Sequence, residues 1–204
     1  MTILKTDTVS GIGTEGTVFE GDITFDSLNY MTLPKGTTTQ SNRGRGLYGG
    51  GASDSSTQYT DIVYLNIQST GNTTQFGDLT VTNRTWIHGV GSATRAIWPG
   101  GSNPSGSSTT NVIDYVTIAT TGNATNFGDL STNSGEGRAL RDSGMASPTR
   151  GLFVGGNYPG SPAWPKVNTV DYIEIATTGN SKDFGDLSVA QSAVPGCSNA
   201  HGGL

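Results

Sequence analysis

The chain has 204 residues, enough for one domain of ordinary size or for one domain with a short arm. It carries 31 glycines, 8% aromatic residues, 13% charged residues and a formal net charge of −5. A modest charge combined with aromatic side chains argues against a disordered chain, and 16 acidic against 11 basic residues argue against nucleic acid as a partner. The sequence shows no secretory signal and no apolar run long enough for a membrane span, so we expect no membrane partner.

The composition favours strands and turns. Thr, Val, Ile, Tyr and Phe are common in strands, and Gly, Asn and Asp are common in tight turns. Gly, Thr and Ser interrupt every window of helical length. The sequence therefore predicts an all-β fold.

Residues 1–40 are predicted to form an amino-terminal β arm. Residues 17–33 read TVFEGDITFDSLNYMTL, in which apolar side chains stand among polar ones on both sides of a Gly21-Asp22 turn. This pattern indicates a hairpin. It supports two interpretations: a strand that closes the repeat array, or an arm that docks the domain onto a larger assembly. The candidate docking residues are Val18, Phe19, Ile23, Phe25 and Tyr30.

The rest of the chain is repetitive. We place three complete repeats at residues 41–94, 95–149 and 150–198, and residues 199–204 match the start of a fourth. The repeats open with RGLYGGG, RAIWPGG and RGLFVGG, continue through a TGN turn and reach the segment FGDL. A period of roughly 50 residues accommodates four strands, as in one blade of a β-propeller.

Each repeat carries the same structural side chains. Glycine doublets end the first strand, where they permit positive φ or close approach of a neighbouring strand. The second strand centres on a tyrosine, and the third places a phenylalanine in the core. The residues expected to build this framework are Gly50, Gly51, Gly100, Gly101, Gly155, Gly156, Tyr64, Tyr115, Tyr172, Phe76, Phe127 and Phe184.

A recurring arginine opens the first strand of each repeat. Arg45, Arg95 and Arg150 occupy this position. We expect them to join neighbouring repeats through a salt bridge or through contacts with backbone carbonyls, because a residue that recurs in every repeat generally serves a repeated structural role.

The order of glycine doublet, tyrosine strand and aromatic strand resembles the kelch repeat, with phenylalanine where a kelch blade usually has tryptophan. The resemblance implies kelch-like four-stranded blades of the β-propeller type. Propellers usually contain about four to eight blades, and three repeats leave open strand edges that invite pairing. An amino-terminal strand, a second subunit or a stacked oligomer would each close the array. We favour a homo-oligomer.

Catalytic and metal-binding sets are absent from the sequence pattern, and we expect a protein that is not an enzyme and needs no cofactor. The two histidines are His88 and His201, and the lone cysteine, Cys197, is expected to be a small buried residue. The longest loop of the third repeat carries Tyr158 and Trp164. These aromatic side chains are the candidate contacts for a ligand such as a host-surface glycan or receptor.

The sequence motifs of the repeats (TRGLF, NTVDYIEIATTGN, FGDL) and the preceding GTVFEGDITFD segment resemble structural proteins of marine phages, cyanophages especially. The resemblance implies a component of the virion, assembled in the host cytoplasm among other virion proteins as a capsid decoration, neck, tail or fibre protein. The alternative is a carbohydrate-binding or receptor-binding adhesin module that uses loop aromatics.

Overall fold

The computed structural model describes residues 44–54, 57, 59–103, 107–131, 137–141, 143–159 and 164–198. The proposed arm at 1–40 and the start of a fourth repeat at 199–204 lie outside the described residues. Within the described part of the chain every regular element is a β-strand, which confirms the all-β prediction. These strands form three separate antiparallel sheets.

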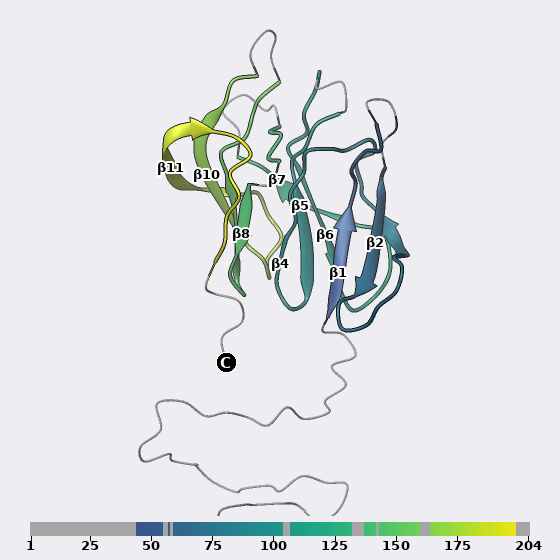
Figure 1. The fold of residues 1–204 in the computed structure, drawn as a ribbon. Helices are drawn as coiled ribbons and strands as arrows, with labels where there is room; N and C mark the ends of the chain where they lie inside the picture. Colours follow the sequence, from purple (N-terminus) through teal and green to yellow (C-terminus); the bar gives the residue numbers. More distant parts are fainter. Residues whose placement is uncertain are drawn as a thin grey trace, which may run out of the picture. The chain divides into compact units, whose positions relative to one another are not determined.

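The three sheets follow one another along the chain, and we call them units 1, 2 and 3 (Figure 1). Unit 1 contains β1 (Arg45–Gly49), β2 (Asp61–Asn66) and β3 (Thr74–Asp78). Unit 2 contains β4 (Val90–Gly91), β5 (Arg95–Pro99), β6 (Val112–Thr117) and β7 (Thr125–Asp129). Unit 3 contains β8 (Gly144–Ala146), β9 (Arg150–Val154), β10 (Val167–Glu174) and β11 (Lys182–Gln191).

Neighbouring units are linked by the segment that leads from the last strand of one sheet to the first strand of the next. The variable segment after β3 continues into β4, which pairs with β5 of unit 2, and the segment after β7 continues into β8, which pairs with β9 of unit 3. Each of these two sheets therefore takes its first strand from the end of the preceding sequence repeat. Beside β1, a cavity of about 200 Å³ is lined by Leu47, Val90 and Trp98 among others.

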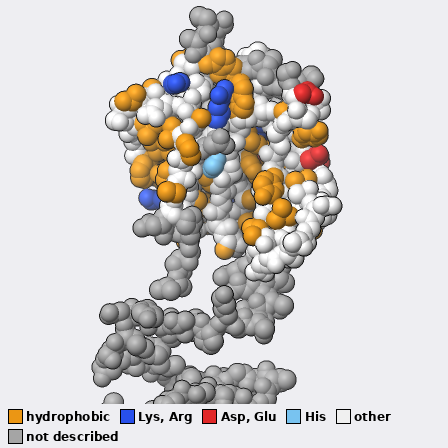
Figure 2. Space-filling model, viewed as in Figure 1, with side chains coloured by type: hydrophobic (Ala, Val, Ile, Leu, Met, Phe, Trp, Pro, Cys, Tyr) orange, Lys and Arg blue, Asp and Glu red, His pale blue; other side chains and the backbone are white. Residues whose placement is uncertain are grey.

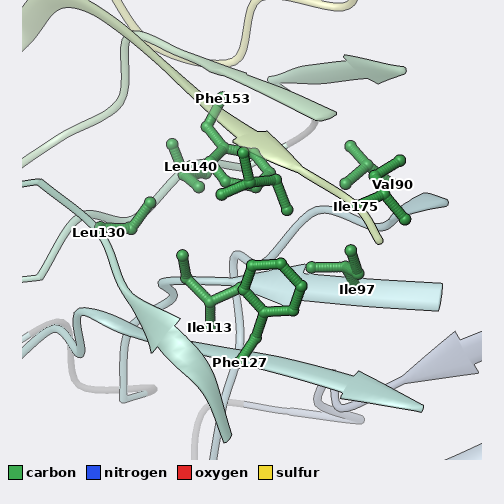
Figure 3. Close-up of a cluster of buried hydrophobic side chains, with 9 residues drawn as sticks. Val90, Ile97, Ile113, Phe127, Leu130, Leu140, Phe153 and Ile175 are labelled. Atoms are coloured by element: carbon green, nitrogen blue, oxygen red, sulfur yellow. The ribbon is translucent and has the colours of Figure 1, made fainter. Parts of the chain in front are cut away.

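The hydrophobic core lies between the sheets. One buried cluster joins unit 1 to unit 2 and includes Ile62, Phe76 and Trp98. A second joins unit 2 to unit 3, and Figure 3 shows side chains of this cluster facing one another. Its members are Val90, Ile97, Ile113, Phe127, Leu130, Leu140, Phe153, Ile173 and Ile175. Burying one such large apolar side chain stabilises a fold by about 1.5–3 kcal/mol. A unit therefore depends on its neighbour for much of its core.

The phenylalanine of unit 3 departs from the expected pattern. Phe76 and Phe127 are buried, each 3% exposed, whereas Phe184 is 55% exposed. The difference has a physical cause, because Phe76 and Phe127 are covered by the following unit and no described residue follows unit 3 in this way. The prediction that Phe184 lies in the core is wrong for the described array. Cys197 is also exposed, not buried as expected.

Two buried ion pairs tie the end of one unit to the next. Arg84, in the segment after β3, donates from Nη1 to Asp114 of unit 2 at 2.6 Å, and both side chains are buried. Its guanidinium also donates to the carbonyl oxygens of Gly100, Trp98 and Val112. Arg138, in the segment after β7, is likewise paired with buried Asp171 of unit 3 and donates to the carbonyl oxygen of Thr169, but its Nε has no partner among the described residues.

Burial opposes the charged form of these groups. It lowers the pKa of Arg84 to about 10, although the charge of Asp114 acts in the opposite direction. It raises the pKa of Asp171 to about 6, against the effect of Arg138. Each buried charge therefore depends on its partner and on the carbonyls around it.

Removing the anion of one pair tests this dependence. We expect D114N to lower the free energy of unfolding by about 3–5 kcal/mol, because Arg84 is left as a buried cation without a counter-charge. The measurement is urea denaturation followed by circular dichroism. The matched control is E174Q, which breaks the solvent-exposed Arg150–Glu174 pair and should have little effect. Equal, small effects of both substitutions would show that the carbonyls alone satisfy Arg84.

Candidate functional site

The loop between β9 and β10 carries both predicted ligand contacts, and hydrogen bonds join its two described ends. The Tyr158 N–H donates to the carbonyl oxygen of Pro165 at 3.1 Å. The side-chain amide of Asn157, a buried residue, donates to the carbonyl oxygen of Trp164 at 2.9 Å. Tyr158 and Trp164 are each partly buried. The structure thus holds Trp164 at a fixed place, and it is not a freely exposed loop side chain.

Trp164 packs against a second tryptophan from a distant segment. The rings of Trp164 and Trp86 meet edge to face, with centroids 5.3 Å apart and an interplanar angle of 77°. The guanidinium carbon of Arg141 lies 4.0 Å from the centroid of the Trp86 ring. The Arg141 N–H also donates to the carbonyl oxygen of Trp86 at 2.9 Å. We call Trp86, Arg141 and Trp164 the tryptophan cluster.

All three members of the tryptophan cluster have left-handed backbone. The φ angles are 53° at Trp86, 40° at Arg141 and 41° at Trp164. This conformation costs a residue other than glycine about 1–2 kcal/mol. Such strain is concentrated at binding and catalytic sites, where surrounding structure enforces it. The convergence of three strained residues makes the tryptophan cluster the best candidate contact site in the described part of the chain.

Two buried polar atoms beside the cluster make no hydrogen bond to the described residues. They are Nε of Arg141 and Oδ1 of Asn157. Buried polar atoms without a partner are uncommon in folded proteins, so these two mark the segments around the cluster as irregular.

Sequence reasoning found only one member of this cluster. Trp164 was recognised as a loop aromatic, whereas Trp86 and Arg141 lie in the variable segments between repeats and carry no repeat signal. No spacing rule joins residues from three such segments. The only available sign was negative: Trp86 has no aromatic counterpart in the other repeats.

The predicted framework residues form a different, repeated arrangement. In each unit the tyrosine of the second strand meets the phenylalanine of the third edge to face, and the first-strand arginine lies over the tyrosine ring. The centroid distances are 5.9 Å for Tyr64–Phe76, 5.7 Å for Tyr115–Phe127 and 5.9 Å for Tyr172–Phe184. The arginine-to-ring distances are 4.9 Å for Arg45, 4.7 Å for Arg95 and 5.0 Å for Arg150.

The glycine doublets have the backbone that was expected of them. All six residues have positive φ, between 60° and 110°: Gly50, Gly51, Gly100, Gly101, Gly155 and Gly156. A side chain at Gly100 would also approach the carbonyl oxygen of Arg138 to 2.4 Å, closer than any real contact. The doublets therefore serve the fold, and they mark where the chain turns from the first strand into the loop.

The remaining predicted features concern other kinds of site. The candidate docking residues Val18, Phe19, Ile23, Phe25 and Tyr30 lie outside the described residues. Within the described ranges no three His, Cys, Asp or Glu side chains gather in a way that could hold a metal ion. No helix in those ranges has the length and apolar character needed to cross a bilayer.

In comparisons with known proteins, no family model matches this sequence, and no match was found among curated proteins.

The tryptophan cluster has a spectroscopic signature that tests its geometry. Two indoles in edge-to-face contact couple their transitions, so we expect an exciton couplet in the far-ultraviolet circular dichroism spectrum. W164A and W86A should each abolish the couplet. W98A is unsuitable as a control because Trp98 is buried in the core. Y59A, which removes an exposed aromatic ring, should leave the couplet intact. A couplet that survives W164A would contradict the contact.

Proposed function

We propose that this protein is a structural component of a phage virion, a capsid decoration, neck, tail or fibre protein, and that it is not an enzyme. The observation that carries the proposal is the use made of the recurring side chains. The Arg–Tyr–Phe stacks are repeated in successive units, and so are the arginine contacts with backbone carbonyls. These recurring side chains hold strands and neighbouring units together. Such a design suits a protein built into a many-copy particle.

Two further features support this reading. The sequence motifs of the repeats and the GTVFEGDITFD segment before them resemble marine phage structural proteins, as described above. The two ends of the described array expose large apolar side chains, among them Tyr48, 58% exposed in unit 1, and Phe184 in unit 3. Figure 2 shows hydrophobic side chains on both the β1–β2 side and the β8–β11 side of the array. Apolar surface of this kind is typical of proteins that function in assemblies.

We also propose that the three units are kelch-like blades of a β-propeller. The support is the crossing strand: β4 and β8 each begin a sheet with residues from the preceding repeat, which is how successive blades of one chain are linked. The glycine doublets at equivalent places in each unit agree with this interpretation.

Incorporation into particles tests the virion proposal. We expect the protein to band with intact virions in a density gradient, in many copies per particle, when phage that encodes it is purified from lysed host cells. Quantitative mass spectrometry of the banded particles provides the copy number. Recovery only in the soluble fraction would contradict the proposal.

The arm can be tested in the same assay. Full-length chain carrying I23D and F25D should fail to join particles, because charged side chains would replace the apolar docking residues. T82D, at an exposed position in the segment after β3, is the control and should still be incorporated. Equal incorporation of both variants would remove the docking role from the arm.

The tryptophan cluster favours a second candidate function, an adhesive module that binds a glycan or receptor on the host surface. We then expect labelled protein to co-sediment saturably with host cells, and W164A to reduce this binding by at least ~10-fold, the scale of a lost aromatic contact. Y59A provides the control for loss of an exposed aromatic ring. Binding that is unchanged in a folded W164A variant would exclude the cluster as the contact.

A further inference from the structure

The two junctions inside the array are built from the same backbone contacts. At the first, the N–H groups of Gly122 and Ala124 donate to the carbonyl oxygens of Phe76 and Asp78 at 2.9 and 2.8 Å. At the second, Gly179 and Ser181 donate in the same way to Phe127 and Asp129, at 2.7 and 2.9 Å. The TGN turn of one unit therefore pairs with the FGD strand of the unit before it.

Side chains complete both junctions in parallel. Asn123 Oδ1 accepts from the N–H of Asp78 at 3.1 Å, and Asn180 Oδ1 accepts from the N–H of Asp129 at 3.0 Å. Two of the three first-strand arginines make the predicted contact with a carbonyl of a neighbouring unit. Arg45 donates to the carbonyl oxygen of Ile118 at 2.7 Å, and Arg95 donates to that of Ile175 at 2.8 Å.

The two end faces carry the two halves of a third junction. Unit 3 presents the FGD strand, with Phe184 55% exposed, and Arg150, which here pairs with Glu174 of its own sheet. Unit 1 presents the TGN turn at residues 70–72, which is exposed, and Ile67, which is 68% exposed and aligns with Ile118 and Ile175. Tyr48, the counterpart of buried Trp98 and Phe153, is also exposed on unit 1.

The buried Arg–Asp pairs of the two internal junctions provide an independent sign that the end faces belong together. The carbonyl oxygens of Arg84, Arg138 and Gln191 accept from Gly51, Gly101 and Gly156, so Gln191 stands in unit 3 where the other units have arginine. Val63 pairs with Tyr48 as Asp114 pairs with Trp98 and Asp171 with Phe153, so Val63 stands where the other units have aspartate.

The arginine and the aspartate are thus replaced together, each at the face that would meet the other. A junction with only one of them would bury a lone charge, which is strongly unfavourable. A junction between Gln191 and Val63 buries none. The end faces match in backbone pairing, in apolar side chains and in charge.

We propose that the unit 3 face of one copy of this chain binds the unit 1 face of a second copy, and that two such junctions close a ring. Joining unlike faces is a heterologous interface, which closes a ring when the rotation between copies allows. Three units per chain give six units in two copies, within the range of about four to eight found in propellers. This inference does not depend on the virion proposal.

The proposal predicts complementation between two single variants. V63D and Q191R should each raise the dissociation constant of the dimer by ~100-fold, because each places a charge at a junction that lacks its partner. An equimolar mixture of V63D and Q191R chains should recover the dimer. In the mixed ring, one junction regains the Arg–Asp pairing of the internal junctions and the other is unchanged from the native sequence.

The measurement is sedimentation-velocity ultracentrifugation of the full chain over a range of concentrations, with circular dichroism to verify folding. Native protein should sediment at twice the chain mass. A single-chain mass for native protein, or a mixture no more associated than its separate components, would overturn the proposal. Mass that rises without limit with concentration would replace the ring with an open filament.

A second variant covers the case in which V63D does not fold. Asn72 aligns with Asn123 and Asn180, and its exposed side chain has no part in the described core. N72A should therefore weaken the dimer without unfolding the chain, because it removes the acceptor for the N–H of Asp186 in the second copy. T73A alters the same exposed turn without removing that acceptor and should sediment like the native protein. Equal association of N72A and T73A would overturn the junction.

Discussion

The contact between successive sheets is the interaction on which the rest of the structure depends. Neither buried cluster lies within a single sheet, so no unit has a complete core of its own. Arg84 shows how closely the units are coupled. Its carbonyl oxygen accepts from Gly51 of unit 1, while its guanidinium binds Asp114 and three carbonyls of unit 2. One residue thus satisfies polar groups in both sheets, and its charge requires that they stay together.

This coupling explains why particular residue types recur. The glycine of the FGD segment lies where the next unit's turn approaches most closely: a side chain at Gly77 would come within 2.1 Å of the carbonyl oxygen of Gly122. A side chain at Gly128 would meet Gly179 in the same way, at 2.3 Å. Arg45 and Arg95, at the start of the first strands of units 1 and 2, both cover a tyrosine and reach a carbonyl of the neighbouring unit. The residues that recur in the sequence are therefore largely the residues that form the junctions between units.

The sequence predicted the strands and the framework because these depend on local chemistry that recurs. Positive φ at the glycine doublets and the carbonyl contacts of Arg45 and Arg95 were each one of two alternatives that residue type and repetition predicted. Phe184 was mispredicted because its burial depends on a neighbour, which the repeat pattern cannot reveal. Trp86 and Arg141 were missed since their meeting with Trp164 depends on how three variable segments are folded back, and no period connects them. The closed propeller and the role in a virion stay proposals.

The division between repeated and unrepeated residues also separates two physical tasks. Repeated side chains meet their partners at low-strain backbone, and the glycines absorb the unusual φ angles. The tryptophan cluster does the opposite, because it holds three bulky residues in left-handed backbone. Strain of this kind persists only where the surrounding fold enforces it. A rigid array of packed sheets can enforce it, so the junctions that join units also help to hold the tryptophan cluster in its strained conformation.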